Sequence, residues 1–208
     1  MRKMVSYFFE KLTKILQSQI FILNCNLRED KHKDNNMVPV FSDKWNYRFM
    51  ELALHISTWS KDSSTKVGCV IVSPEKAILS MGYNGFPRGV NDDISTRHER
   101  PTKYDFVVHA EENAILNAGR RGTRLDGGIL YVTMPPCTRC AGSIIQSGIK
   151  EVVYLSPNEQ KRIPGWRDNL KYSFEMFNES GVKVTELNRD LVNINMTTKF
   201  LILIQKQK

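Results

Sequence analysis

Two short segments of this 208-residue chain carry side chains of the types that bind zinc, and the need to bring them together is the strongest constraint on its fold. The first segment is His109-Ala110-Glu111, and the second is Pro135-Pro136-Cys137-Thr138-Arg139-Cys140. One imidazole and two thiolates supply three zinc ligands, the number typical of catalytic sites, because the fourth position there stays open for water. We therefore expect a fold that places His109, Cys137 and Cys140 around one point.

The sequence around the cysteines predicts a helix that begins at about Cys137. The two prolines before it stiffen the approach, and proline is favoured at helix starts. Cys137 and Cys140 are three positions apart, so both sulfur atoms project from one face of that helix. The helix N-terminus is the positive end of the helix dipole and favours the thiolate, which is the form that binds metal.

His109 is predicted to begin a second helix that runs to about Ala118. His109 and Glu111 face one centre only if this helix begins at the histidine, because residues two positions apart do not share a helix face. Zinc lowers the pKa of its bound water to ~7. Glu111 has the length to take a proton from that water and return it to a substrate, which makes it the candidate catalytic residue.

A Cys-x-x-Cys pair is also compatible with a structural zinc knuckle or a redox pair. A structural zinc site usually has four protein ligands. The available candidates for a fourth, His98 and Cys69, are not placed at finger-like spacing. Cys69 falls in the middle of an apolar run, where a packed core thiol is expected. His109 and Glu111 together favour a catalytic zinc ion, one per chain.

Alternating apolar segments predict the fold class. Apolar residues at helical spacing follow a capping Ser42 or Asp43 and recur over residues 169–179. Strands are predicted at residues 67–72, 77–82, 128–133, 151–155 and 182–187, of which the first two form an antiparallel hairpin. This order predicts an α/β fold, a three-layer α/β/α sandwich with a mixed, mostly parallel central sheet of about five strands.

Three regions are expected along the chain. Residues 37–187 form the globular domain, residues 1–36 an amphipathic and polar N-terminal extension, and residues 188–208 a C-terminal tail in which 196–204 resemble an edge strand or a partner contact. Within the extension the longest apolar run, Ile20–Leu23, is far shorter than the ~20 residues that cross a bilayer. An ordinary helix packed on its own core or a neighbouring subunit, a partner-docking helix and a membrane-surface helix all fit the extension.

Charge and cysteine content bear on the partner and the compartment. Of the net charge of +8, residues 1–40 and 188–208 each carry +3 and the residues between them only +2. A polymer-binding enzyme more often has a basic stripe around its pocket, so the distribution favours a small substrate over nucleic acid. Four cysteines are too few for a secreted disulfide framework and suit a reducing, cytoplasmic compartment.

The metal segments resemble the cytidine/deoxycytidylate deaminase superfamily, in which His-x-Glu is followed by Pro-Cys-x-x-Cys. The segments Asp62–Gly68, Gly82–Gly89 and Arg97–Pro101 resemble the deoxycytidylate (dCMP) deaminase branch, and the resemblance covers roughly residues 43–187. It implies the cytidine-deaminase type of sandwich and zinc-dependent hydrolysis of dCMP to dUMP and ammonia, which feeds dTTP synthesis. It also implies a cytosolic homo-oligomer, often a hexamer, activated by dCTP and inhibited by dTTP.

The resemblance assigns roles to individual residues. His109, Cys137 and Cys140 hold the metal, and Glu111 moves protons. Substrate contacts fall to Asn84, the backbone N–H of Ala110 and, for the phosphate, the candidates Arg120 and Arg88. Both arginines are equally compatible with a solvated surface position, and Arg139 is expected to be structural or intersubunit. The glycine-rich segment 82–89 is a candidate substrate loop, although a plain surface loop has the same composition.

Two other functions stay open from the sequence. The first is a deaminase that acts on a base of tRNA or single-stranded DNA, which predicts a basic, aromatic-lined groove. The second is a non-catalytic zinc domain that attaches to a membrane or a partner through residues 1–23. Glu111 argues against the second, because a structural zinc site has no use for that carboxylate.

Overall fold

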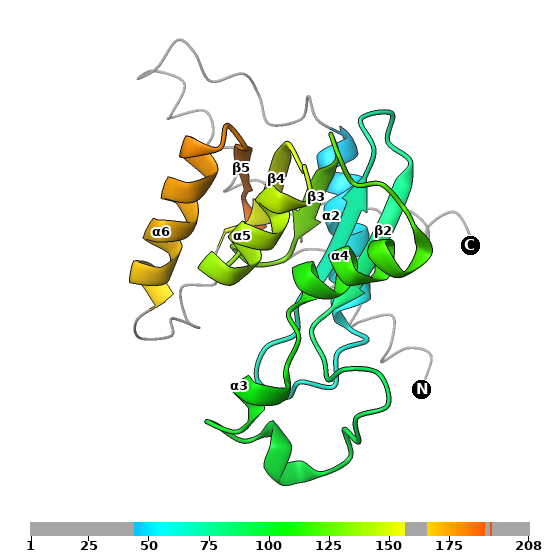
Figure 1. Ribbon diagram of the computed structural model, residues 1–208, viewed down its shortest axis with the longest axis vertical. Coiled ribbons are helices and arrows are strands. Elements are labelled where there is room, and N and C mark those ends of the chain that lie inside the picture. Colours follow the sequence, from blue (N-terminus) through cyan, green and yellow to red (C-terminus); the bar gives the residue numbers. More distant parts are fainter. Residues whose placement is uncertain (1–43, 157–165, 190–191, 193–208) are drawn as a thin grey trace, which may run out of the picture. The chain divides into compact units, whose positions relative to one another are not determined.

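The computed structural model describes residues 44–156, 166–189 and 192, which include a five-stranded sheet in the order β2-β1-β3-β4-β5 (Figure 1). The strands are β1 (Gly68–Val72), β2 (Ile78–Tyr83), β3 (Ile129–Val132), β4 (Glu151–Leu155) and β5 (Lys183–Leu187). Each of them coincides with one of the strands predicted from the sequence.

Strand β1 runs against the other four strands. It pairs antiparallel with β2 and with β3, while β3 and β4, and β4 and β5, pair in parallel. Strand β2 therefore has the same direction as β3, β4 and β5. The prediction of a mixed, mostly parallel sheet that begins with a hairpin is confirmed.

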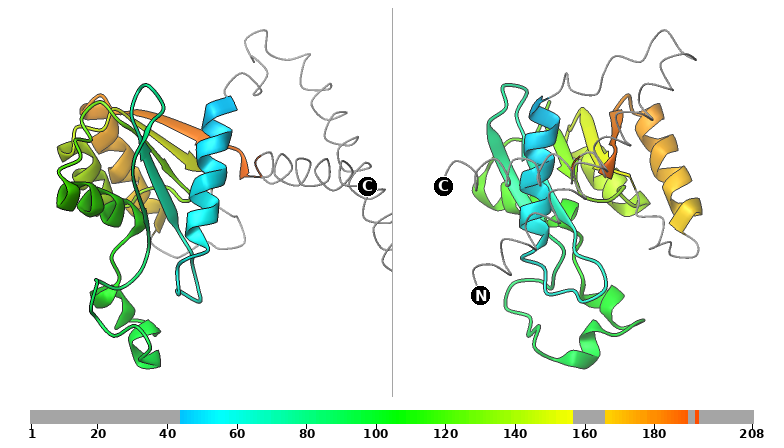
Figure 2. Two further views of the ribbon diagram at one scale, coloured as in Figure 1. Left: turned by 90° about the vertical axis from the view of Figure 1, so that its right-hand side faces the viewer. Right: turned by 180° about the vertical axis from the view of Figure 1, so that it is seen from behind.

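Helices cover both faces of the sheet, as Figure 2 shows. Helix α2 (Lys44–Ser57) packs on one face, and α4 (Ala110–Arg121), α5 (Thr138–Gln146) and α6 (Trp166–Glu179) pack on the other. Successive side chains of a strand point to opposite faces. Hence β1 contributes Cys69 and Ile71 to the core under α4 and α5, and Val70 and Val72 to the core under α2. This confirms the three-layer sandwich and explains why β1 is a continuous apolar run.

A glycine allows β2 to lie directly against the first turns of α4. A Cβ atom added at Gly82 would lie 2.5 Å from the backbone oxygen of Ala110 and 2.5 Å from the backbone nitrogen of Ala114. No side chain fits at that distance, so the close approach requires glycine. The contact fixes the N-terminal end of α4, which is the end that carries His109 and Glu111.

Between β2 and α4 the chain leaves the sheet and forms a segment that we call the arm, residues 85–108. It contains the 3₁₀ helix η3 (Ser95–His98) and the short helix α3 (Lys103–Phe106). An antiparallel bridge between Gly85 and Val108 holds its two ends together. In Figure 1 the arm extends beyond the end of the sheet at which α4 begins, and it forms part of the cavity described below.

Some predictions fall outside the described residues. These are the helix in residues 1–36, the possible edge strand at 196–204 and most of the tail 188–208, so the domain boundaries stay predictions. In the part of the chain that the structure does describe, none of the helices is both long enough and apolar enough to traverse a bilayer.

Candidate metal centre

His109, Cys137 and Cys140 meet at one point between the N-termini of α4 and α5. The Nδ1 atom of His109 lies 3.4 Å from the Sγ atom of Cys137 and 3.4 Å from that of Cys140. All three ligand atoms lie within 4.8 Å of one another. The fold therefore brings the two metal-binding segments together as the sequence predicts.

The spacing of these three atoms fits a zinc ion. In a tetrahedral site with Zn–N of ~2.0 Å and Zn–S of ~2.3 Å, a nitrogen and a sulfur ligand lie ~3.5 Å apart. Among the His, Cys, Asp and Glu side chains of the described residues, His109, Cys137 and Cys140 are the one group placed to hold a metal ion. Three protein ligands of this kind leave one position of a tetrahedral ion for water.

Neither alternative fourth ligand lies in this group. Cys69 is fully buried in β1, and the ring of His98 stacks on Phe86 in the arm with ring centroids 4.7 Å apart. The positions of Cys69 and His98 thus give no support to a four-ligand structural zinc site.

The two helices begin immediately after His109 and Cys137. His109 is the N-cap of α4 and Cys137 the N-cap of α5, and both have extended backbone dihedrals. The requirement that the helix begin at the histidine is met, so Glu111 in the first turn of α4 and the His109 ring both reach the cavity.

Hydrogen bonds among the three ligands favour a thiolate at Cys137. The hydrogen bonds from Cys140 and His109 lower the pKa of the Cys137 thiol to about 4, although burial raises it. The hydrogen bond to Cys137 and burial raise the pKa of Cys140. The hydrogen bond to Cys137 also raises the pKa of His109, against the effect of burial. A bound metal ion would favour the thiolate form of both cysteines.

Glu111 is buried beside the three ligands. Its side chain is on the first turn of α4, and the residue is 4% exposed. Burial raises the pKa of Glu111 to about 7, although the charge on His109 lowers it. A carboxyl group with a pKa near the working pH is suited to both accepting and donating a proton.

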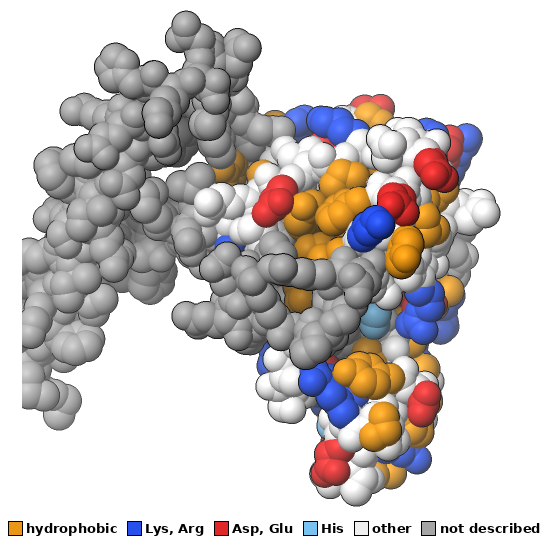
Figure 3. Space-filling view, turned by 90° about the vertical axis from the view of Figure 1, so that its left-hand side faces the viewer, with side chains coloured by type: hydrophobic (Ala, Val, Ile, Leu, Met, Phe, Trp, Pro, Cys, Tyr) orange, Lys and Arg blue, Asp and Glu red, His pale blue; other side chains and the backbone are white. Residues whose placement is uncertain are grey.

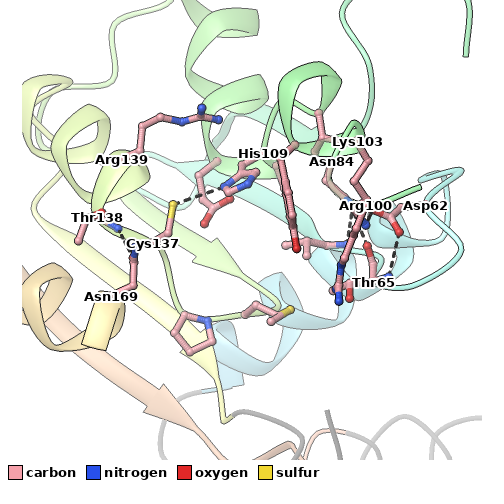
Figure 4. Close-up of a pocket in the computed structure, with 17 residues that line it drawn as sticks. Asp62, Thr65, Asn84, Arg100, Lys103, His109, Cys137, Thr138, Arg139 and Asn169 are labelled. Carbon is pink, nitrogen blue, oxygen red and sulfur yellow. Dashed lines mark hydrogen bonds and ion pairs between the residues drawn. The ribbon is translucent and has the colours of Figure 1, made fainter. Parts of the chain in front are cut away.

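The metal centre opens into a cavity of about 370 Å³, shown in Figure 4. Two groups of polar side chains lie on opposite sides of it, which we call the metal side and the polar side. The metal side is formed by His109, Cys137, Thr138, Arg139 and Asn169, and the polar side by Asp62, Thr65, Asn84, Arg100 and Lys103. A cavity of this size accommodates a small molecule.

Two of the predicted substrate-binding residues line the cavity. Ala110 lies at the start of α4, where its backbone N–H has no partner within the helix. Asn84 is buried on the polar side, and its carboxamide is bonded to the preceding loop. Its Oδ1 atom accepts a hydrogen bond from the backbone N–H of Val67 at 2.8 Å, and its Nδ2 atom donates one to the carbonyl of Thr65 at 2.9 Å.

The two arginines predicted to bind phosphate lie elsewhere. Arg88 and Arg120 are exposed and do not line the cavity. Arg88 donates a hydrogen bond to Asn117 at 2.6 Å. Arg120 is in the last turn of α4, about 16 Å along the helix axis from His109. The structure does not bring either of them to the metal centre.

Other cations line the cavity instead. Arg100 and Lys103 come from the arm, and Arg139, which pairs with Glu112 at 3.0 Å, comes from α5. The sequence did not predict a role for Arg100 or Lys103, because the direction in which the arm folds is not encoded in any periodic pattern of residues. The only available signal was their closeness in sequence to His109.

Comparisons with known proteins agree with this site. Residues 43–156 match the family model of the cytidine and deoxycytidylate deaminase zinc-binding region. An uncharacterised deaminase of Aliivibrio fischeri is 43% identical over 149 residues, which cover 72% of this chain and 97% of that protein. The deoxycytidylate deaminase of Homo sapiens is 42% identical over 118 residues, which cover 54% of this chain and 65% of that protein.

A solved structure supports the same assignment. The crystal structure of the dCMP deaminase from the cyanophage S-TIM5 in complex with dCMP and dUMP has a TM-score of 0.55 and 26% sequence identity. The match covers 73% of this chain and 100% of that one. With the fold, the cluster of His109, Cys137 and Cys140 and these matches in agreement, the chain belongs to the cytidine and deoxycytidylate deaminase family.

Proposed function

We propose that this protein is a zinc-dependent hydrolase that converts dCMP to dUMP and ammonia and so serves pyrimidine deoxynucleotide synthesis. The observation that carries the proposal is the meeting of His109, Cys137 and Cys140 beside the buried Glu111 in a cavity of small-molecule size. The names of the relatives supply the substrate, because the human protein is a deoxycytidylate deaminase and the cyanophage structure contains dCMP and dUMP.

We propose that His109, Cys137 and Cys140 hold the ion. A zinc ion bound there would supply hydroxide near neutral pH by lowering the pKa of its water. Glu111 takes one proton from the attacking water and delivers it to the ring nitrogen next to the reacting carbon. It then carries the second proton, from the added hydroxyl group that becomes the carbonyl oxygen, to the departing amine. In balance, the bond between the pyrimidine carbon and the amino nitrogen breaks, a bond to the water oxygen forms, and ammonia leaves.

The remaining contacts follow from the two sides of the cavity. The N–H of Ala110 donates a hydrogen bond to the pyrimidine carbonyl, which places the base on the metal side. Asn84 then faces the sugar, since a carboxamide oxygen accepts two hydrogen bonds and its contact with Val67 uses one. We assign the phosphate to Arg100, which lines the polar side, in preference to the earlier candidates Arg88 and Arg120.

Assembly, regulation and location rest on the family resemblance. It supports a homo-oligomer, activation by dCTP and inhibition by dTTP, and a cytoplasmic protein. Sedimentation velocity tests the homo-oligomer, and deamination rates with and without dCTP test the activation. A single monomeric species under all conditions would contradict the oligomer.

A substrate panel tests the proposed reaction. Ammonia release is measured with zinc-loaded protein on dCMP, CMP, dCTP, deoxycytidine and a tRNA anticodon stem-loop, with and without dCTP as activator. The proposal predicts the highest kcat/KM on dCMP. Activity on the stem-loop alone would indicate a polynucleotide deaminase, and no activity on any of them would favour a non-catalytic zinc domain.

On the face shown in Figure 3, the charged side chains of the described residues form no continuous positive groove. Figure 3 shows the face that carries α6, where the Lys and Arg side chains of the described residues are scattered among acidic and hydrophobic ones. A groove for single-stranded nucleic acid has a continuous positive surface with stacking aromatic rings.

A further inference from the structure

A buried lysine links the arm to the wall of the cavity. Lys103, the first residue of α3, is 8% exposed. Lysine is almost never fully buried unless it is paired, because burying a lone ammonium group is very unfavourable. Its Nζ atom donates hydrogen bonds to Oδ2 of Asp62 at 2.8 Å and to Oγ of Ser64 at 2.7 Å. The dashed lines in Figure 4 mark the pair with Asp62.

Asp62 is the centre of a hydrogen-bonded loop that precedes β1. Its Oδ1 atom accepts hydrogen bonds from the backbone N–H groups of Ser64 at 2.8 Å and Thr65 at 3.1 Å, and from the Ser64 hydroxyl at 2.8 Å. Burial raises the pKa of Asp62, but the hydrogen bonds from Lys103, Ser64 and Thr65 outweigh it and lower the pKa to about 2. The carboxylate is therefore ionised throughout the neutral range.

The same loop determines how Asn84 is oriented. The Nδ2 atom of Asn84 donates to the carbonyl of Thr65 at 2.9 Å and to Oδ2 of Asp62 at 3.4 Å, while Oδ1 accepts from Val67. With both N–H groups engaged, the carboxamide has one orientation. Asn84 thus depends on the 62–67 loop, and Lys103 holds that loop from the arm.

A second ion pair joins the same two segments without reaching the cavity. Lys61 pairs with Asp92 of the arm at 2.8 Å, and their side chains are 61% and 37% exposed. Exposed pairs of this kind contribute little to stability. By contrast, the side chains of Lys103 and Asp62 are each 10% exposed. Lys61 therefore offers a matched control for a lysine that links the loop to the arm.

We propose that Lys103 is a positioning residue that acts through Asp62 to hold the 62–67 loop and Asn84 in place for the sugar end of the nucleotide. This inference rests on the proposed function and adds to it a residue outside the metal centre. Lys103 is on the polar side of the cavity, so its loss affects substrate binding more than the chemical step at Glu111.

The test is a double-mutant cycle on dCMP deamination. Lys103→Met and Asp62→Asn each remove the ion pair and are expected to raise KM by about 3- to 10-fold, the scale of one lost hydrogen bond to the substrate, with a smaller change in kcat. Because both variants disrupt one unit, the double variant should raise KM no further than either single variant. The control Lys61→Met should leave KM, kcat and zinc content unchanged.

Several results would overturn the proposal. An unchanged KM in Lys103→Met would do so. A double variant whose increase in KM is the product of the two single increases would also do so, because it would mean that Lys103 contacts the substrate directly. If Lys103→Met does not fold, Ser64→Ala removes one contact of Nζ without leaving a buried unpaired charge, and it must raise KM in the same direction.

Hydrogen exchange separates this inference from the proposed function. Amide exchange of residues 64–67 should accelerate in Lys103→Met and Asp62→Asn, but not in Lys61→Met, whether or not dCMP is the substrate. If the wild-type protein deaminates dCMP but amide exchange in Lys103→Met and Asp62→Asn equals that of the wild type, the positioning role alone is refuted. Wild-type protein that does not deaminate dCMP would refute the proposed function alone.

Discussion

The Nδ1 atom of His109 lies 3.4 Å from the Sγ atom of Cys137, although the two residues are 28 positions apart and cap different helices. Each residue has extended backbone dihedrals and a helix begins directly after it, so both ligands are N-cap residues. Three such ligand atoms with a buried carboxyl group beside them form a site for catalysis more readily than for structure, since a structural zinc site is closed by a fourth protein ligand.

Glu111→Gln should abolish most of the activity while leaving the metal bound. The amide keeps the size of the side chain and the ability to hydrogen-bond but cannot accept the proton, so kcat should fall by about 10²–10⁴-fold. Steady-state kinetics on dCMP and zinc analysis of the same preparation measure both quantities. Glu175→Gln is the control, because Glu175 of α6 does not line the cavity and its side chain is 53% exposed. Equal activity of Glu111→Gln and wild type would exclude Glu111 as the proton carrier.

Gly82→Ala should destabilise the fold, because the new methyl group would lie 2.5 Å from backbone atoms of Ala110 and Ala114. Overpacking of this kind costs about 1–3 kcal/mol. The control is Gly119→Ala on the exposed side of α4, since a Cβ there meets no atom within 4 Å and replacing a helical glycine gains up to about 1 kcal/mol. Urea denaturation gives both free energies of unfolding. A Gly82→Ala protein as stable as Gly119→Ala would contradict the close packing of β2 on α4.

The ion pair of Asp62 should make stability depend on pH in the acid range. The pKa of Asp62 falls from its ordinary value of 3.8 to about 2 in the folded protein. The stabilisation is therefore complete above about pH 4 and is lost as the pH falls through about 2. Urea denaturation of wild type and Asp62→Asn between pH 5 and pH 2 should show a difference that shrinks with falling pH, and Lys103→Met should behave similarly. A difference that is constant or grows would contradict the assigned pKa direction.

Arg100→Gln should weaken binding of dCMP more than binding of deoxycytidine, because only the nucleotide carries a phosphate. The ratio of kcat/KM on the two substrates measures this effect independently of the chemical step. Arg88→Gln and Arg120→Gln, which replace exposed arginines away from the cavity, should leave the ratio near the wild-type value. A ratio that changes in Arg88→Gln or Arg120→Gln and not in Arg100→Gln would indicate that Arg88 or Arg120 binds the phosphate.

The sequence predicts the layers of this fold because the apolar residues of its core segments recur at the spacing of helices or form continuous strand-length runs. The continuous apolar run of β1 reflects burial on both faces, and the two helix N-termini at the metal centre follow from proline before Cys137 and from the need to join His109 with Glu111. These are local signals, and local signals are readable from one chain.

The polar side of the cavity was not predictable in the same way. Lys103 is buried only because the arm folds back onto the 62–67 loop, and that contact joins residues 41 positions apart without any periodic pattern. Arg120 is a phosphate candidate because arginine binds phosphate through its planar guanidinium group, but it lies in the last turn of α4, and the rise of the helix carries it away from His109.

The most direct test of the metal centre is X-ray absorption at the zinc edge on the zinc-loaded protein. One zinc ion per chain with one nitrogen ligand at ~2.0 Å, two sulfur ligands at ~2.3 Å and one further oxygen from water is the expected result. Substituting Cys137 or Cys140 by serine should remove one sulfur from that shell. A shell closed by a fourth nitrogen or sulfur atom from the protein, or zinc that stays bound with both sulfurs after either substitution, would contradict an open catalytic site.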